Sequence, residues 1–181
     1  MICSEGYEQL NQKKAQWDDN AAPSEDGAVF HGVVDTMLNL AFLTQRFYSD
    51  YAHCTEILHK EDRPHILAQI VVDGILFGIP FRSNINHPHA ILTYENEKYG
   101  LDLSKTIIIT DKTKYIDATR KPFIRQNEFE FLLNKERLIK VELARYIKKY
   151  KNAKKKIHIP RNRMLVQCST LQYFEEYLPL E

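Results

Sequence analysis

The dipeptide Asp73-Gly74 restricts the fold of this 181-residue chain more than any other sequence feature. It separates two runs, 65–72 and 75–81, that are rich in β-branched and aromatic residues and alternate with a period of two. A two-residue Asp-Gly connection favours a type I′ turn, in which both central residues take a positive φ. Both faces of the runs carry apolar side chains, so we predict a β-hairpin at the centre of a sheet.

A cluster of polar and titratable residues follows the second run directly. It contains a guanidinium, a hydroxyl, two amides and two imidazoles: Arg82, Ser83, Asn84, Asn86, His87 and His89. Histidine titrates near neutral pH, and arginine offers five donors to an anion. Because a sheet fixes such groups while a loop exposes them, this segment is a candidate site. The alternative is a polar loop that only closes a hairpin.

Shorter β-rich runs extend the predicted sheet. Strands are expected at 89–94, 106–110 and 115–117, with turns at 95–100 and 111–113.

Helical patterns account for most of the remaining chain. We predict helices at 43–58, 127–133 and 137–150, the first two capped by Thr44 and Asn127. Pro160 is assigned to a connection, and Ser169 is the expected N-cap of a last helix that ends near 178. Together the patterns predict an α+β fold, an antiparallel sheet with helices packed around it.

Charge is distributed unevenly, although the net charge is only +1. Residues 1–26 carry six acidic residues and two lysines, a net of −4, whereas residues 135–163 carry twelve Lys and Arg and two Glu, a net of +10. Such a basic segment favours an anionic partner, nucleic acid before membrane, although a solvated helix face has the same composition. The candidate RNA-contacting lysines are Lys148, Lys149, Lys151, Lys154, Lys155 and Lys156.

The cysteines and the start of the chain bear on localisation. Three cysteines at no metal-like spacing are typical of a reducing cytosol. The first residues lack the apolar core of a secretory signal, and the most apolar early run, 27–43, is too short to span a bilayer. We therefore predict a cytoplasmic protein with no membrane partner.

The first 36 residues differ in composition from the rest of the chain. Residues 13–26 are polar and lead through Pro23 to Gly27, which is typical of a loop or tail. Met37 could serve as a natural start. We interpret residues 1–36 as an N-terminal extension and residues 37–181 as the functional domain.

The residue types suit cleavage of RNA without a metal or a cofactor. The chain has no Walker loop, GxGxxG, HExxH, CxxC pair or GxSxG motif. RNA supplies its own nucleophile, the 2′-hydroxyl, so a protein must remove that proton, stabilise the charged phosphorane and protonate the leaving oxygen. Arg, Ser, Lys and His can perform these steps. The alternatives are a protein that binds structured RNA without cutting it and, more weakly, a DNA-binding repressor.

Several short motifs carry a family resemblance in their order and spacing. They are residues 60–64, 79–83 with His87, 100–105, 126–129 and 169–174. Over residues 37–178 the chain resembles the toxins of type III toxin–antitoxin systems, the ToxN/AbiQ group, and within it most closely the TenpIN branch.

The resemblance implies a metal-independent endoribonuclease that leaves 2′,3′-cyclic phosphate and 5′-hydroxyl ends. It also implies a compact, partly barrel-like antiparallel β core similar to the Kid and MazF toxins. The expected partners are target mRNA and an inhibitory antitoxin, a small repeat RNA folded as a pseudoknot, which forms a cyclic protein–RNA hetero-oligomer with the toxin. The expected role is growth arrest or phage abortive infection.

The resemblance also suggests site residues. Ser83 matches the family's active-site segment, Arg82 is then a phosphate ligand, and His87 matches a position that is often basic. The ToxN branch has a lysine shortly after that serine, where this chain has Ile85. A basic residue from elsewhere must therefore serve, and the candidates are Lys60, Arg63 and Lys105. Ser104 is a further neighbour of the expected site.

Overall fold

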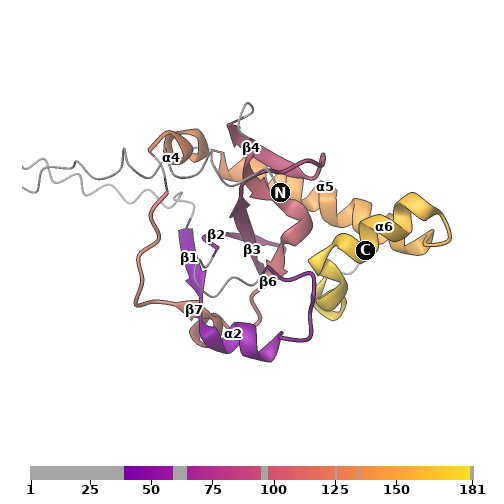
Figure 1. The fold of residues 1–181 in the computed structure, drawn as a ribbon, viewed down its shortest axis with the longest axis horizontal. Coiled ribbons are helices and arrows are strands. Elements are labelled where there is room, and N and C mark those ends of the chain that lie inside the picture. Colours follow the sequence, from indigo (N-terminus) through magenta and orange to yellow (C-terminus); the bar gives the residue numbers. More distant parts are fainter. Residues whose placement is uncertain (1–38, 59–64, 95–97, 125, 134, 180–181) are drawn as a thin grey trace, which may run out of the picture. The chain divides into compact units, whose positions relative to one another are not determined.

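The computed structural model describes residues 39–58, 65–94, 98–124, 126–133 and 135–179. The fold is α+β, as predicted, with a seven-stranded antiparallel sheet and several helices (Figure 1). The strands are β1 (Asn39–Leu43), β2 (Leu67–Val72), β3 (Ile75–Arg82), β4 (Ala90–Tyr94), β5 (Tyr99–Asp102), β6 (Ile107–Ile108) and β7 (Ile116–Asp117). Their order is β4-β5-β3-β2-β1-β7, and β6 also pairs with β3.

The predicted hairpin is confirmed and is central. Asp73 and Gly74 have φ angles of 51° and 77°, as a type I′ turn requires. The turn sets the register, in which Val72 lies opposite Ile75. Strand β3 pairs with β2, with β6 near its start and with β5 at its end. The end of β3, where Arg82 lies, is therefore held beside β5, with Arg82 opposite Gly100.

The sheet is open. Among the described residues its outer strands, β4 and β7, pair with β5 and β1 and not with each other. The expectation of a partly barrel-like core similar to Kid and MazF is therefore not confirmed and stays a prediction. The predicted boundary between residues 36 and 37 lies outside the described residues.

Gly100 allows β4 and β5 to approach each other closely. A Cβ atom at this position would overlap the carbonyl oxygen of Ile91 and lie 2.8 Å from the Cα atom of Leu92. Both are backbone atoms, so relief would require the strands to separate. Because β5 leads directly into Asp102, this close pairing supports the site described below.

We predict that Gly100→Ala lowers the free energy of unfolding by about 1–3 kcal/mol, because the added methyl group overpacks the strand pair. Gly78→Ala is the matched control. Its Cβ would lie 3.2–3.3 Å from side-chain atoms of Leu67, Ile107 and Ile109, which can shift more easily than the backbone atoms that face Gly100. Urea unfolding of both variants tests the prediction, and an equal loss for the two would contradict it.

The helices lie mainly in the second half of the chain. They are α2 (Gln45–Asp50), α3 (Lys112–Tyr115), α4 (Gln126–Leu132), α5 (Glu136–Lys155) and α6 (Pro160–Cys168), with 3₁₀ turns η3 (Leu103–Lys105), η4 (Thr170–Tyr173) and η5 (Glu175–Tyr177). The predicted stripe of α5 is confirmed, since Ile139, Leu143, Tyr146, Ile147 and Tyr150 are all buried. In the described segments, no helix is long and apolar enough to cross a membrane.

The prediction of one helix over 43–58 was wrong. Thr44 is the N-cap and accepts a hydrogen bond from the Phe47 amide at 3.3 Å, but α2 ends at Asp50. Phe47 packs against the rings of Tyr51 and Tyr115 at 4.6 and 5.4 Å between centroids. Phe47 is thus in the core and Tyr51 packs against it, but tertiary packing rather than a continuous helix brings them there.

Four other local predictions need correction. The strand at 106–110 is limited to Ile107–Ile108, and Asp111, placed in a turn, caps helix α3. Tyr99, also placed in a turn, begins β5. Asn127 lies inside α4, which begins at Gln126. Each error lies at an element boundary, where local preference is weakest.

The C-terminal predictions were partly wrong. Pro160 begins helix α6 instead of lying in a connection, because its fixed φ and missing N–H suit the first helical position. Ser169 is a cap as predicted and accepts from the Leu171 amide at 3.3 Å. The segment that follows forms the 3₁₀ turns η4 and η5 rather than one helix.

Candidate functional site

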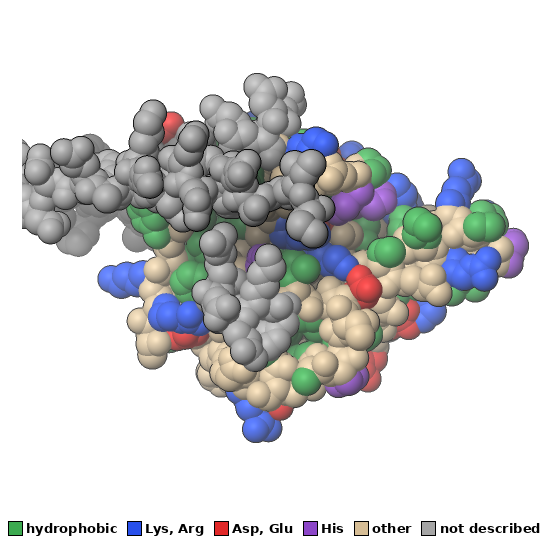
Figure 2. All heavy atoms as spheres, in the orientation of Figure 1, with side chains coloured by type: hydrophobic (Ala, Val, Ile, Leu, Met, Phe, Trp, Pro, Cys, Tyr) green, Lys and Arg blue, Asp and Glu red, His purple; other side chains and the backbone are tan. Residues whose placement is uncertain are grey.

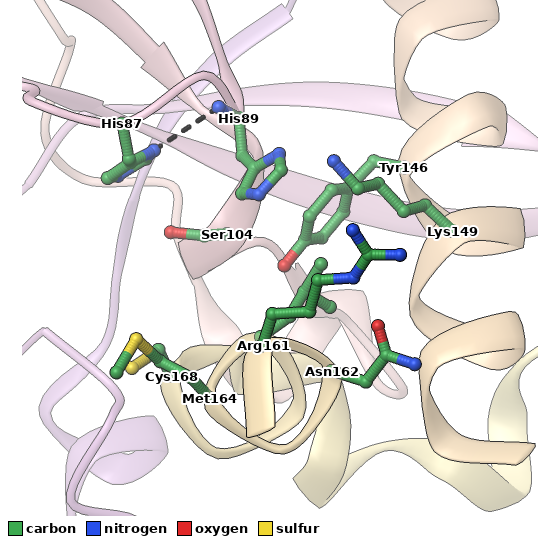
Figure 3. Close-up of a pocket in the computed structure, with 10 residues that line it drawn as sticks. His87, His89, Ser104, Tyr146, Lys149, Arg161, Asn162, Met164 and Cys168 are labelled. Carbon is green, nitrogen blue, oxygen red and sulfur yellow. Dashed lines mark hydrogen bonds between the residues drawn. The ribbon is translucent and has the colours of Figure 1, made fainter. Parts of the chain in front are cut away.

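A cavity of about 640 Å³ lies where the segment before β4, the 3₁₀ turn η3 and helices α5 and α6 meet (Figure 3). Its lining residues are His87, His89, Ser104, Tyr146, Lys149, Arg161, Asn162, Met164, Leu165 and Cys168. Sites for small ligands typically occupy about 300–1,000 Å³. Figure 2 shows histidine side chains beside Lys and Arg side chains in the part of the view where Figure 1 draws α5.

His89 is the titratable side chain best suited to proton transfer. Its ring lies 5.4 Å from that of Tyr146 and 5.9 Å from that of His87. Within the described part of the chain, neither ring nitrogen of His89 has a hydrogen-bond partner. Burial lowers the pKa of His89, and the charges of Lys149 and His87 lower it further. The imidazole is therefore neutral at pH 7 and can accept a proton.

Asp102 was not predicted as a site residue. Its carboxylate anchors the side chains next to the cavity. Its side chain is fully buried. One carboxylate oxygen accepts from Arg82 Nη1 at 2.5 Å and lies 3.4 Å from His87 Nε2. The other accepts from the backbone N–H and the hydroxyl of Ser104, at 2.9 and 2.6 Å. A buried carboxylate is tolerated because all these donors surround it.

The bonds of His87 fix its ring. Its Nδ1 atom accepts from the backbone N–H of His89 at 3.3 Å, the dashed line in Figure 3. The proton of a neutral ring then belongs on Nε2, the atom that faces Asp102. Asp102 thereby orients His87, and His87 in turn holds the backbone at His89.

Two cations border the cavity opposite the histidines. Lys149 from α5 and Arg161 from α6 are exposed, and Figure 3 shows both reaching toward Tyr146. Among the described residues neither has an acidic partner. Unpaired cations at the rim of a cavity are available to bind an anion such as a phosphate.

A second hollow of about 360 Å³ shares Lys149 with the cavity and continues between α5 and α6. Its basic side chains are Arg145, Lys148, Lys149 and Lys156, which we call the basic groove. These positions recur at helical spacing, so they lie on one face of α5. The cavity therefore opens along a basic surface long enough for more than one phosphate.

Tyr146 forms part of the inner wall and is not a base. Burial raises its pKa to about 12, and its hydroxyl donates to Ser169 Oγ at 2.9 Å. The ring is therefore neutral and its hydroxyl is occupied. Among the described residues, no cluster of three or more His, Cys, Asp or Glu side chains could hold a metal ion.

The structure brings together some of the predicted site residues. His87, His89, Ser104 and Lys149 line the cavity, and Lys148 and Lys156 line the basic groove.

Other predicted residues lie outside the cavity lining. Arg82 contacts the site only through Asp102. Ser83 and Asn84 are exposed, and Asn86 accepts from Lys98. Lys105 pairs with Glu56 and donates to the Cys168 carbonyl at 3.0 Å. Their predicted roles stay predictions.

Three predicted RNA-contacting lysines also lie outside the basic groove. Lys151 donates to the Pro179 carbonyl, and Lys154 pairs with Glu175. Lys155 is exposed. Lys60 and Arg63 lie outside the described residues.

Five residues at the site were not predicted from the sequence: Asp102, Tyr146, Arg161, Asn162 and Met164. Three of them lie on α6, and the signal that could have revealed this helix is Pro160 at its first position. Asp102 carries the signal of an Asx turn, an aspartate followed two residues later by a serine.

Comparison with known proteins identifies no relative: no family model, no curated protein and no solved structure matches this chain.

Proposed function

We propose that this protein is an endoribonuclease that cleaves RNA by attack of the RNA's own 2′-hydroxyl. The observation that carries the proposal is the cavity that a neutral His89 shares with Lys149 and Arg161, two cations without an acidic partner among the described residues. A base and a pair of phosphate ligands on opposite sides of one space are what this reaction requires.

In the proposed reaction His89 takes the proton of the 2′-hydroxyl. The 2′-oxygen bonds to phosphorus, and the bond from phosphorus to the 5′-oxygen breaks. Lys149 and Arg161 stabilise the charge on the phosphorane oxygens. Water supplies the proton to the leaving 5′-oxygen, while His87, oriented by Asp102, holds the backbone at His89. The products are a 2′,3′-cyclic phosphate and a 5′-hydroxyl.

We further propose that the enzyme is the cytoplasmic toxin of a type III toxin–antitoxin system, acting in growth arrest or phage defence. Its inhibitor would be a repeat RNA folded as a pseudoknot and held in a cyclic complex. The ordered short motifs support this proposal, and so does the basic groove, which extends beyond a single nucleotide. A core related to Kid and MazF is part of the same proposal.

A second candidate function is binding of structured RNA without cleavage. One observation favours it: two predicted catalytic cations, Arg82 and Lys105, are paired with Asp102 and Glu56. Paired in this way, they brace the fold rather than face a substrate. The basic groove would serve a binding protein equally well.

Incubation of the protein with structured repeat RNA in the presence of EDTA separates the two functions. An endoribonuclease gives fragments with 5′-hydroxyl ends and cyclic phosphates, which phosphatase and kinase treatments identify. RNA that is shifted on a gel but remains intact would contradict the proposed cleavage and favour the binding protein.

The basic groove makes a separate prediction about salt. Replacing Lys148 and Lys156 with Gln should weaken RNA binding and reduce the slope of log affinity against log salt by about 1.4, since each phosphate contact to single strands contributes about 0.7. The control replaces Lys151 and Lys154, which bind Pro179 and Glu175 on another side of α5. Its slope should equal that of the unmodified protein. Equal slopes for the two variants would contradict RNA binding by the basic groove.

A further inference from the structure

The inner wall of the cavity is apolar, although its rim is cationic. Met164, Leu165 and Cys168 of α6 form one side, and the Tyr146 ring forms another. Met164 is 67% exposed, so its side chain is accessible to a ligand in the cavity. The half-buried ring of His89 packs on the buried ring of Tyr146 and adds a ring surface, the kind of platform on which RNA bases stack.

Asn162 presents a single kind of hydrogen-bonding group to this space. Its Nδ2 atom donates to the Lys156 carbonyl at 3.0 Å, which fixes the orientation of the amide. Its Oδ1 atom has no partner among the described residues, and Figure 3 shows it on the side of Arg161 and Lys149. The cavity therefore offers an acceptor beside the cations.

We propose that the cavity holds one nucleotide, with its phosphate at Lys149 and Arg161 and its base on the apolar wall, and that Asn162 selects bases with an amino group at C6 of a purine or C4 of a pyrimidine. The selected bases are adenine and cytosine. The inference deepens the proposed function, because the RNA substrate would supply this nucleotide.

The physical reason lies in the base edge. Adenine at C6 and cytosine at C4 carry an amino group, which can donate to Oδ1. Hypoxanthine and uracil carry a carbonyl oxygen at the same positions, and two acceptors facing each other lose the bond and leave Oδ1 unpaired. Discrimination between amino and oxo bases therefore requires only this one fixed amide.

Binding of four mononucleotides to the full-length protein tests the inference. The pairs AMP and IMP, and CMP and UMP, each differ in the group at one ring position. We expect AMP and CMP to bind about tenfold more tightly than their partners by titration calorimetry, the difference that one hydrogen bond of about 1.4 kcal/mol produces. Adenosine, which lacks the phosphate, should bind more weakly than AMP. Equal affinities within both pairs would overturn the inference.

Two variants assign the discrimination to its residue. Asn162→Ala should bring AMP down to the affinity of IMP and leave IMP unchanged. Asn152→Ala, which alters an amide of the neighbouring hollow on α5, should keep the full difference. If the Asn152 variant, and not the Asn162 variant, lost the difference between AMP and IMP, the assignment to Asn162 would be overturned. Thermal melts show whether each variant folds, and the comparison of nucleotide pairs on the unmodified protein needs no variant.

The outcome is separable from that of the proposed function. If RNA stays intact while the amino nucleotides bind preferentially, the nuclease proposal fails and the nucleotide site stands. If RNA is cleaved but neither pair is discriminated, the nuclease proposal stands and this inference fails.

Discussion

Replacing Asp102 with alanine is expected to lower the free energy of unfolding by about 3 kcal/mol, the largest stability effect predicted for this protein. The Asp102 side chain is fully buried, whereas that of Arg82 is 29% exposed. Removal of the Asp102 carboxylate leaves Arg82 without its counter-ion and Ser104 without its acceptor. A partly buried guanidinium that loses its partner cannot fully recover its hydration. Urea or thermal unfolding measures the loss.

Asp117 provides a matched control on the surface. It binds the backbone and hydroxyl of Thr119 and the guanidinium of Arg120, the same set of donor types as at Asp102. It lies on the outer strand β7 and its side chain is 16% exposed, compared with none for Asp102, so water can reach the carboxylate. Asp117→Ala should therefore cost much less. If the two variants lose similar stability, burial of Asp102 is not what makes its bonds important.

Replacing His89 with glutamine is expected to reduce RNA cleavage by about 10²–10⁴-fold, the usual contribution of a general base. RNA affinity should change little, because the cations of the cavity and groove remain. Single-turnover cleavage and gel-shift measurements on the same RNA separate the two quantities. His53→Gln is the control, since His53 is exposed and lies outside the cavity lining. If the His89 variant kept full activity, His89 would not be the general base.

The pH dependence tests the same residue without altering it. Burial and the neighbouring charges lower the pKa of His89 below its ordinary 6.5, so the base stays neutral as the pH falls through 6.5. The acidic limb of the cleavage rate should therefore lie below pH 6.5. Lys149→Gln removes one of these charges and should move that limb upward. An acidic limb well above pH 6.5 in the unmodified protein would contradict the assignment.

The same lowered pKa has a consequence for stability. The unfolded chain takes up the His89 proton at a higher pH than the folded chain does. Because the unfolded state then binds more protons, this residue makes the fold less stable as the pH drops below about 6.5. The effect of pH on unfolding should be smaller in the His89→Gln variant.

The pairing of Arg82 with Asp102 changes how the predicted polar cluster is understood. The segment from Arg82 to His89 was expected to face one ligand as a unit. Instead, Arg82 and His87 meet on Asp102, while His89 points into the cavity. The cluster thus divides into Arg82 and His87, which hold neighbouring groups in position, and His89, which is placed to react with a substrate.

Sequence alone determined the elements whose signals are local. Asp73-Gly74 specified the turn and register of the central hairpin, and the periodicity of residues 139–150 specified the buried face of α5. Both follow from backbone conformation and side-chain direction within a few residues.

Only the tertiary structure decided the site. His89 is far from Lys149 and Arg161 in sequence, and the three residues meet because α5 packs against β2 and α6 packs against α5. Arg82 reaches Asp102 because β3 pairs with β5, which no local pattern near either residue encodes. Periodicity reports which face of an element is buried, but not which elements pack together. The composition of a cavity between elements is therefore a property of packing.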